Sequence, residues 1–514
     1  MERAGLQRSE GGSRELETGS WKLEAGSWKL ETGNCYAHAA ASRMISESEP
    51  SPAHWWARPS LHVALLALVV GLAYVPDVGH GFVKDDFAWI LASRAGSVGD
   101  LRRLFEATSG FYRPVVSLSF ALNEYASGLS PLGYGLANLG LALLAAGGIG
   151  WVARLWRLPP SACVFAAALW LLNLHGINMA VLWISGRTAL FLTLFAVLAA
   201  AAVAKDRPAT AALFLFGALL SKEEAVLLPL PLLLMLVAMG GKRGRIAVTA
   251  SLFAAAEIAY FVLRARSGAM TPVTAPWFYR FTFDWSQVAR NIAEYADRSC
   301  TFTLVCLLVL LALVRRRPAL SESERRIVAV GLGWLCLGFA ITVFLPVRSS
   351  LYACFPSAGI AWAGAAAATA IWRAAPPRRQ QAAAIAAIVL ALALVPVYRV
   401  RNVRWVELAD LTAGVMPGLE QASRASSDGT ILIVDERTTR ANIASAFGGL
   451  IPEAATLVAG RRRSIWLVPP PSGTDAAEIV AVPPGPRDAW VLRDKRLVRV
   501  DAARWTGAEA IVLR

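Results

Sequence analysis

Two adjacent carboxylates, Asp85 and Asp86, stand in the stretch GFVKDDFAW, directly after an apolar run at residues 61–75. Charged side chains beside a bilayer are costly, and they usually mark a functional site. Repulsion between neighbouring carboxylates would raise one pKa toward neutrality or favour binding of a divalent metal ion. The same pair is also common at the solvated start of a helix. The surrounding residues must therefore decide between these interpretations.

Other polar side chains occur where apolar runs begin or end. Lys84 precedes the aspartates, and Arg113 stands before a proline suited to the first position of a helix. Each candidate also has a structural interpretation: Arg187 could anchor a helix end by snorkelling, and Lys222 could form an internal ion pair. The remaining candidates are Asn138, His175, Arg187, Lys222, Glu223, Arg348 and Tyr352.

The composition of the chain sets the class of protein that must position these residues. Of 514 residues, 56% are hydrophobic and 17% charged, and the mean hydropathy is +0.48. A chain of this length with so little polar surface is a polytopic membrane protein. Its net charge of +15 does not indicate a nucleic-acid partner, because the arginines cluster between apolar runs. Six cysteines without a CxxC pair give no indication of a zinc site or a disulfide framework.

The order of segments predicts three parts. Residues 1–50 contain a seven-residue repeat (ETGSWKL, EAGSWKL, ETG), which we interpret as disordered or as translated upstream DNA preceding a true start at Met44. Residues 55–400 form a transmembrane domain, and residues 401–514 form a small α/β domain with the strands GTILIVDE, SIWLVPP and AWVLRDKRLVRV. The transmembrane domain contains about eleven apolar segments, at 60–76, 132–153, 161–175, 187–204, 208–221, 223–240, 246–264, 300–314, 327–345, 351–372 and 380–398.

The distribution of Lys and Arg predicts the orientation. One alternate set of loops carries these residues at roughly four times the density of the other set, and the basic set is expected to be cytoplasmic. The N-terminus is then cytoplasmic, whereas GFVKDDFAW and the C-terminal domain face away from the cytoplasm. The abundance of Ala, Arg, Leu and Gly favours a bacterial inner membrane.

Six short motifs occur in order between about residues 60 and 405: KDDFAW, FYRPVVSLSFALNEY with PLGYGLAN, WISGR, LLSKE, LPVRSSLY and RNVRW. In this order they resemble the GT-C superfamily of multipass glycosyltransferases, in particular the transmembrane and tetratricopeptide-containing O-mannosyltransferases and their bacterial counterparts. The chain departs from that pattern in three ways. No histidine closes the motif that begins at Asn138, Met179 replaces a glutamate, and no tetratricopeptide repeats follow RNVRW. These departures leave the acceptor open.

The resemblance implies a GT-C-like fold and an enzyme that moves a sugar from a polyprenyl-phosphate donor to a hydroxyl acceptor on a glycan, lipid or protein. The displacement would invert the sugar carbon, with Asp85 or Asp86 as general base. Cations would hold the lipid phosphate, and other polar groups would bind the acceptor or support the site. The former are Lys84, Arg113, Arg187, Lys222 and Arg348, and the latter are Glu223, His175, Asn138 and Tyr352.

Two other functions remain open from the sequence. One is a non-catalytic membrane scaffold with the same fold, and the other is a lipid or solute transporter. Transporters commonly place ionisable groups near the bilayer midplane on broken helices and contain inverted repeats. Here the charges flank the loops and no repeat is visible, which favours the glycosyltransferase.

Overall fold

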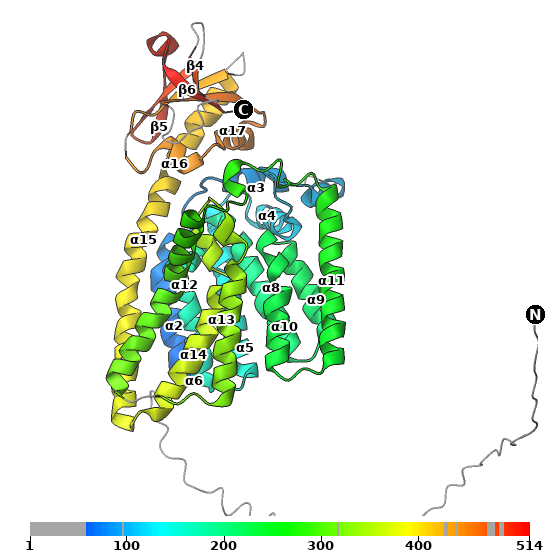
Figure 1. Ribbon diagram of the computed structural model, residues 1–514. Coiled ribbons are helices and arrows are strands. Elements are labelled where there is room, and N and C mark those ends of the chain that lie inside the picture. Colours follow the sequence, from blue (N-terminus) through cyan, green and yellow to red (C-terminus); the bar gives the residue numbers. More distant parts are fainter. Residues whose placement is uncertain are drawn as a thin grey trace, which may run out of the picture. The chain divides into compact units, whose positions relative to one another are not determined.

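The structure is a computed structural model that describes residues 58–94, 97–315, 318–425, 430–437, 439–469, 479–482 and 488–513 (Figure 1). The N-terminal repeat predicted to be disordered lies outside the described residues. The transmembrane domain is helical, and a mixed sheet follows at the C-terminal end of the chain.

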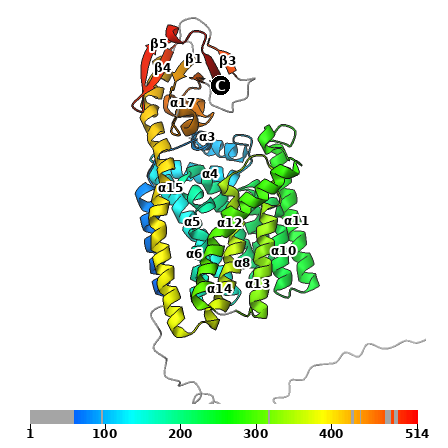
Figure 2. The ribbon, with the colours of Figure 1, turned by 60° about the vertical axis from the view of Figure 1, so that its left-hand side comes forward.

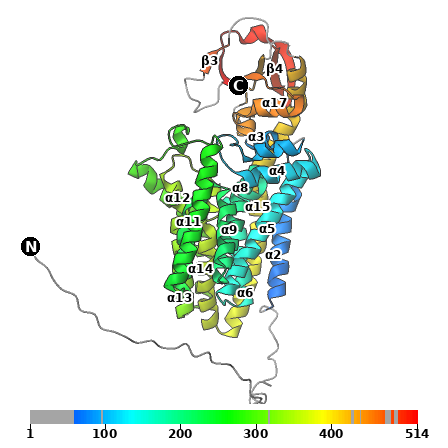
Figure 3. The same ribbon diagram turned by 90° about the vertical axis from the view of Figure 1, so that its right-hand side faces the viewer.

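Seven helices in the described part of the chain are long and apolar enough to cross a membrane. Figure 3 shows them running side by side. Several begin at a proline, which suits the first helical position because its missing N–H would have no partner there. They are α2 (Pro59–Tyr74), α5 (Pro131–Leu155), α8 (Arg187–Ala204), α11 (Arg243–Arg266), α12 (Trp285–Val314), α13 (Glu322–Phe339) and α15 (Pro377–Ala425).

Shorter helices complete the transmembrane domain. Helices α6 (Pro160–Leu171) and α7 (Gly176–Leu182) are bent by 71° at a short break and count as one further span if taken together. The others are α9 (Pro208–Leu219), α10 (Pro229–Ala238) and α14 (Ser357–Ala374). All eleven apolar segments predicted from the sequence are thus helical, which confirms the all-α transmembrane core. By length and apolarity seven of them, or eight with the bent pair, qualify as spans.

Several long helices bury few of their apolar residues within the protein. The most apolar windows of α11 and α12 have mean hydropathies of 2.0 and 1.9, yet only 17% of each window is buried. Ile258 on α11 is 65% exposed and Leu308 on α12 is 63% exposed. Such surfaces are stable in lipid, because apolar tails are a suitable solvent for them and every helical backbone group is bonded internally. The chain is therefore an integral membrane protein.

Small residues allow the inner helices to approach closely. A Cβ added to Gly331 on α13 would lie 2.4 Å from the carbonyl oxygen of Gly359 on α14, and the reverse substitution would be equally close. Lipid supplies no hydrophobic driving force between helices. Small residues at such crossings let the backbones approach, and the van der Waals packing that results stabilises the contact. The indoles of Trp334 and Trp362 pack edge to face beside this crossing, with ring centroids 5.0 Å apart.

Helix α15 connects the transmembrane domain to the sheet (Figure 2). It packs against α2 along one part of its length and against α16 and α17 of the C-terminal domain along another. The domain boundary predicted at residue 400 falls inside this helix, which continues from Pro377 to Ala425. Prolines occur within it at Pro396 and Pro417, positions that leave backbone carbonyls without a helical donor.

The C-terminal domain is a six-stranded sheet with the order β3-β6-β2-β1-β4-β5. Strand β1 pairs in parallel with β2 and β4, and the other pairs are antiparallel. This arrangement confirms the predicted α/β domain and its predicted strands. The elements are β1 (Thr430–Val434), α16 (Ile443–Phe447), α17 (Ile451–Ala459), β2 (Ser464–Val468), β3 (Ile479–Ala481), β4 (Asp488–Arg493), β5 (Arg496–Asp501) and β6 (Glu509–Leu513).

Most of the candidate site residues lie in, or within two residues of, short connecting elements. These elements are η2 (Val75–Asp77), α3 (Asp86–Ser93), η3 (Val98–Phe105), α4 (Pro114–Ser127), η4 (Ile184–Gly186), η5 (Glu223–Leu227), η6 (Trp277–Tyr279), η7 (Thr342–Phe344) and η8 (Ser350–Ala353).

Candidate functional site

The two candidate aspartates follow a tight turn between α2 and α3. Lys84 adopts a left-handed backbone conformation with φ of +51°, which few non-glycine residues adopt. Its N–H donates to the carbonyl oxygen of Ala446 at 2.8 Å, and this hydrogen bond holds the turn. Asp85 follows as the N-cap of α3, and Asp86 is the first residue of that helix. The two carboxylates therefore leave the backbone in different directions and meet different surroundings.

The Asp86 carboxylate is fully buried and bonded to protein donors. Its Oδ2 accepts the N–H of Val83 at 2.9 Å, and its Oδ1 accepts the N–H and hydroxyl of Ser185 at 2.7 and 2.5 Å. Burial raises the pKa of Asp86 to about 7, although these hydrogen bonds act in the opposite direction. Asp86 thus joins the KDDFAW turn to the WISGR motif, and none of its surface reaches solvent.

Asp85 is exposed, and its carboxylate makes no hydrogen bond or ion pair with any residue that the structure describes. Part of its surface reaches solvent, and the rest is surrounded by protein. The resulting burial raises the pKa of the Asp85 carboxyl above the ordinary aspartate value, while the charges of Lys84 and Arg113 act to lower it. Of the two predicted bases, Asp85 is the carboxylate with lone pairs available to a substrate.

Arg187 lies in the interior rather than at the surface. Its guanidinium donates to Asn138 Oδ1 at 3.1 Å, to Asn123 Oδ1 at 2.6 Å and to the carbonyl oxygen of Tyr134 at 3.2 Å. It also stacks 4.2 Å above the ring of Phe120, and it has no exposed surface. These contacts join α8 to α4 and α5.

The amide of Asn138 supports the same region. Its Nδ2 donates to the carbonyl oxygens of Ala180, Trp183 and Ile184 at 3.1–3.2 Å, where α7 turns into η4. The structure therefore places Asn138 as a support for the WISGR turn, buried without exposed surface.

Arg113 forms an ion pair with a distant glutamate. Its Nε and terminal nitrogen donate to Glu223 Oε2 at 3.0 and 2.7 Å, and Arg264 approaches the other oxygen at 3.4 Å. Burial by itself would raise the pKa of Glu223, but the two guanidinium groups lower it overall, so the carboxylate is ionised. Two of the predicted site residues thus neutralise each other.

Two further predicted cations, Lys222 and Arg348, are also paired. Lys222 lies 2.6 Å from Glu224, with both side chains less than a tenth exposed, and its ammonium lies 4.8 Å from the ring centre of Tyr352. Burial raises the pKa of the Tyr352 phenol well above its ordinary value. Arg348 pairs with Glu294 on α12.

Two arginines of the RNVRW motif, which the candidates named from the sequence do not include, differ from these. The half-buried Arg401 and Arg404 make no ion pair with any described residue, and the Nε of each is buried without an acceptor. The indole N–H groups of Trp183 and Trp405 are buried without acceptors as well, and their rings stack with centroids 5.8 Å apart. Buried donors without acceptors are rare and call for an explanation. In the sequence, the signal was the i, i+3 spacing of Arg401 and Arg404 beside Trp405.

Contacts fix the rotation of α15 at this point. Asn402 Nδ2 donates to Asp77 Oδ2 and to the carbonyl oxygen of Ala73, both at 2.8 Å, and its Oδ1 accepts from Asn178 at 2.8 Å. Arg399 pairs with the same Asp77 carboxylate. Asn402 is held in the core. Arg401 and Arg404, which are about one turn apart, therefore lie near each other on a different side of the helix from Asn402.

Lys84 connects these cations to Asp85. Its ammonium lies 5.9 Å from the ring centre of Trp405, and the Arg404 guanidinium lies 5.5 Å from the same ring. Burial lowers the pKa of Lys84, the carboxylate of Asp85 acts to raise it, and Arg404 acts to lower it. We define Lys84, Arg401 and Arg404, with Trp183 and Trp405, as the cation cluster. None of its three cations has an acidic ion-pair partner among the described residues.

His175 lies in the break between α6 and α7, beside this cluster. Its imidazole is half-buried, and the charge of Arg401 acts on it. The described residues contain no group of three His, Cys, Asp or Glu side chains placed to hold a metal ion. The divalent metal considered from the aspartate pair stays a prediction.

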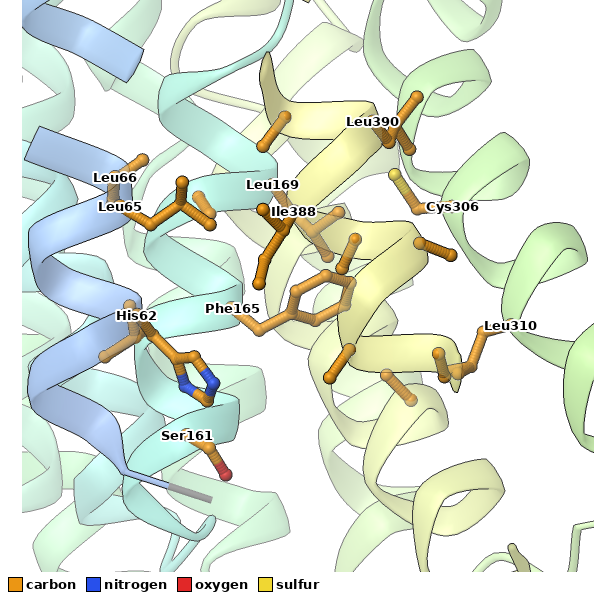
Figure 4. A pocket seen from close by; sticks show the side chains of 18 of the residues that line it. His62, Leu65, Leu66, Ser161, Phe165, Leu169, Cys306, Leu310, Ile388 and Leu390 are labelled. Carbon is orange, nitrogen blue, oxygen red and sulfur yellow. The ribbon is translucent and has the colours of Figure 1, made fainter. Parts of the chain in front are cut away.

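An apolar cavity of about 400 Å³ lies between α2, α6, α12, α14 and α15 (Figure 4). Leu65 and Phe165 line it, with His62 and Ser161 among its few polar side chains. The lining residues end at Leu394 on α15, seven residues before Arg401. On α6 they end at Leu172, three residues before His175, and on α12 at Phe302, four residues after Arg298. At 1.5 Å per residue, Arg401 follows the end of the cavity by roughly 10 Å.

Comparisons with known proteins give likenesses of fold. No family model matches the sequence, and no curated protein matches it. The crystal structure of ArnT from Cupriavidus metallidurans bound to undecaprenyl phosphate is similar with a TM-score of 0.47 and 13% identity, covering 81% of this chain and 86% of that chain. The apo state of the same protein gives 0.36 and 14%, covering 79% and 85%. The function proposed below rests on contacts of this chain's own residues.

Proposed function

We propose that this chain is an integral membrane glycosyltransferase of the GT-C type, which transfers a sugar from a polyprenyl-phosphate donor to a hydroxyl acceptor. The observation that carries the proposal is an unpartnered carboxylate, Asp85, beside a cation cluster that has no acidic ion-pair partner among the described residues. Charges at a membrane edge are costly unless they are paired or bind a ligand. An anionic substrate group accounts for the cations, and a hydroxyl proton accounts for the carboxylate.

The apolar cavity and the cation cluster together suit an amphiphilic donor. The cavity would take the phosphate-proximal part of an isoprenoid chain, and the cluster at its end would take the phosphate. Arg401 and Arg404 offer guanidinium groups that match phosphate geometry, and the indole N–H groups of Trp183 and Trp405 add two neutral donors. Phosphate oxygens would then accept hydrogen bonds from the four buried donors of the cluster, which are the Nε groups of Arg401 and Arg404 and the indole N–H groups of Trp183 and Trp405.

Transfer would proceed in one displacement. The acceptor oxygen attacks the anomeric carbon, its proton passes to Asp85, and the bond from that carbon to the phosphate oxygen breaks. The electron pair of the broken bond stays on the polyprenyl phosphate, whose added negative charge Lys84, Arg401 and Arg404 stabilise. Because the acceptor oxygen and the leaving oxygen occupy opposite sides, the sugar carbon inverts.

The ion pairs elsewhere support this assignment of roles. Arg113, Lys222 and Arg348 each have a carboxylate partner, and Arg187 is enclosed by amide and carbonyl oxygens. We therefore assign these four residues to support of the site, and the base to Asp85 rather than Asp86. The density of Lys and Arg predicts that the site faces away from the cytoplasm, and the abundance of Ala, Arg, Leu and Gly favours a bacterial inner membrane. The acceptor is a glycan, a lipid or a protein.

Binding of a polyprenyl phosphate to the protein in nanodiscs tests the donor site. Arg401→Gln and Arg404→Gln should each weaken binding about 10- to 100-fold, because a hydrogen bond to a charged group contributes about 1.5–3 kcal/mol. Arg325→Gln, on an exposed arginine paired with Glu322, should bind as the wild type does. If Arg401→Gln and Arg404→Gln bind polyprenyl phosphate as tightly as Arg325→Gln does, the phosphate site is excluded. Transfer from a panel of polyprenyl-phosphate-linked sugars to membrane acceptors tests the reaction itself.

A further inference from the structure

The turn that bears Lys84 and Asp85 is held from the C-terminal domain. The 2.8 Å hydrogen bond from the Lys84 N–H to Ala446 joins it to α16. Phe87, one residue beyond the aspartates, stacks on Phe447 of the same helix with ring centroids 5.2 Å apart and an interplanar angle of 17°. Both rings are buried. Contacts from the C-terminal domain therefore help to hold Lys84 in its left-handed backbone conformation, with φ of +51°.

The C-terminal domain also holds the far end of α3. Arg94, which follows the last residue of that helix, donates to the carbonyl oxygen of Leu457 on α17 at 3.2 Å. The same guanidinium pairs with Glu124 of α4 at 2.7 Å. Helix α3 is thus fixed at both ends by the domain, and Figure 2 shows α17 next to it.

Close packing joins the C-terminal domain to α15, the helix that carries Arg401 and Arg404. A Cβ added to Gly414 would lie 2.4 Å from the carbonyl oxygen of Lys495, and one added to Gly418 would lie 2.7 Å from the Cβ of Leu497. Only glycine permits this approach of the β4–β5 hairpin to the helix. The domain is therefore placed against α15 by direct packing.

The charge of one arginine of this domain acts on the cation cluster. Arg440 precedes α16, which packs against α15, and its charge acts on Arg404. It is exposed and makes no ion pair or hydrogen bond with a described residue. The same short segment, 440–447, thus carries a cation near the cluster and the two contacts to the Lys84 turn.

We propose that the segment 440–447 of the C-terminal domain is a working part of the donor site. Ala446 and Phe447 position the Lys84–Asp85 turn, and Arg440 adds a fourth cation for the donor phosphate. This inference rests on the proposed function. It assigns the C-terminal domain a part in binding and positioning, and it predicts separate effects for the two kinds of residue.

Positioning is tested with Phe447→Ala and Phe447→Tyr. The alanine variant should lower kcat about 10- to 100-fold with little change in donor KM, because a displacement near 1 Å misaligns the base. The tyrosine variant keeps the stacked ring and should restore most of the rate. Leu432→Ala is the matched control, since Leu432 is buried in a separate core cluster of the same domain. A loss in Leu432→Ala equal to that in Phe447→Ala, at the same folded fraction, would reject positioning in favour of general stability.

Phosphate binding is tested with Arg440→Gln, against Arg461→Gln as an exposed arginine of the same domain. Arg440→Gln should weaken polyprenyl phosphate binding about 5- to 10-fold, because a charged donor to phosphate is lost. Arg461→Gln should bind as the wild type does. Equal affinity of the two variants would overturn the role of Arg440.

Hydrogen exchange separates this inference from the proposed function. In the wild type the Lys84 amide should be protected, and Phe447→Ala should make the peptide containing residues 82–88 exchange at least tenfold faster. Unchanged exchange would reject the positioning contact. Hydrogen exchange does not depend on sugar transfer. If the wild type binds no polyprenyl phosphate, the proposed function is refuted. The exchange result then still tests the positioning contact.

Discussion

Replacing the two aspartates separately is the sharpest test of the site. Asp85→Asn removes a carboxylate that makes no hydrogen bond or ion pair with a described residue, so the melting temperature should stay within about 1 °C of the wild type, as surface substitutions usually do. Transfer should fall about 10²- to 10⁴-fold, the usual contribution of a general base. Asp86→Asn should keep most of its activity per folded molecule, because its carboxylate faces protein donors alone.

The stability of Asp86→Asn can be worked from the contacts. An amide oxygen facing Ser185 keeps two of three accepted hydrogen bonds, but the amide N–H₂ then faces the Val83 N–H across a 2.9 Å contact. One buried donor without an acceptor costs about 1–3 kcal/mol. The folded pKa of about 7 is raised above the unfolded value, so the wild type is relatively stabilised at low pH and loses that contribution as pH rises through 7.

The variant carries no titrating group at position 86, so its deficit in stability should shrink between pH 5 and pH 8.5. Thermal unfolding in nanodiscs across this range measures the deficit, and a transfer assay with lipid-linked sugar measures the rate. Glu106→Gln is the matched control for Asp85→Asn, because Glu106 is exposed in the same connection between α2 and α4. Full transfer by Asp85→Asn together with abolished transfer by folded Asp86→Asn would refute the assignment.

Three other outcomes follow from the same contacts. Because burial raises the pKa of Asp85 and the base must be ionised, kcat/KM should fall as pH drops through a midpoint above the ordinary aspartate value; a flat acid limb would contradict this. Glu224→Gln should destabilise the protein by about 3–5 kcal/mol in thermal unfolding by leaving Lys222 buried and unpaired, and Lys222→Met in addition should recover most of it. Ala391→Phe, which projects into the cavity, should raise KM for a long-chain donor about tenfold but hardly for a short-chain one; an equal effect of Ala393→Phe, which does not line the cavity, would argue against a tail site.

Much of the fold could be predicted from the sequence because its determinants are local. Apolar runs specify helices wherever backbone groups must be satisfied internally, and all eleven predicted runs are helical. The strand patterns of the C-terminal domain were equally readable, since GTILIVDE and SIWLVPP are short β-rich runs that became β1 and β2. Lengths of single spans were less predictable, because α6 and α7 bend by 71° at a break that tertiary contacts support.

The sequence also identified which residue types take part, since the motifs KDDFAW, WISGR and RNVRW meet in space. Asp86 bonds Ser185, and Trp183 stacks on Trp405. The sequence did not determine which charges are free. Arg113 finds its carboxylate 110 residues away and Arg187 finds its amides 49 and 64 residues away.

Only the tertiary structure showed the different surroundings of Asp85 and Asp86 and added Arg401 and Arg404 to the candidates. The physical reason is that a charged side chain serves as a ligand or as a structural support according to whether a counter-charge or hydrogen-bond partner lies within a few ångströms. That distance is set by the packing of helices and by one left-handed residue at Lys84, and sequence separation does not encode it.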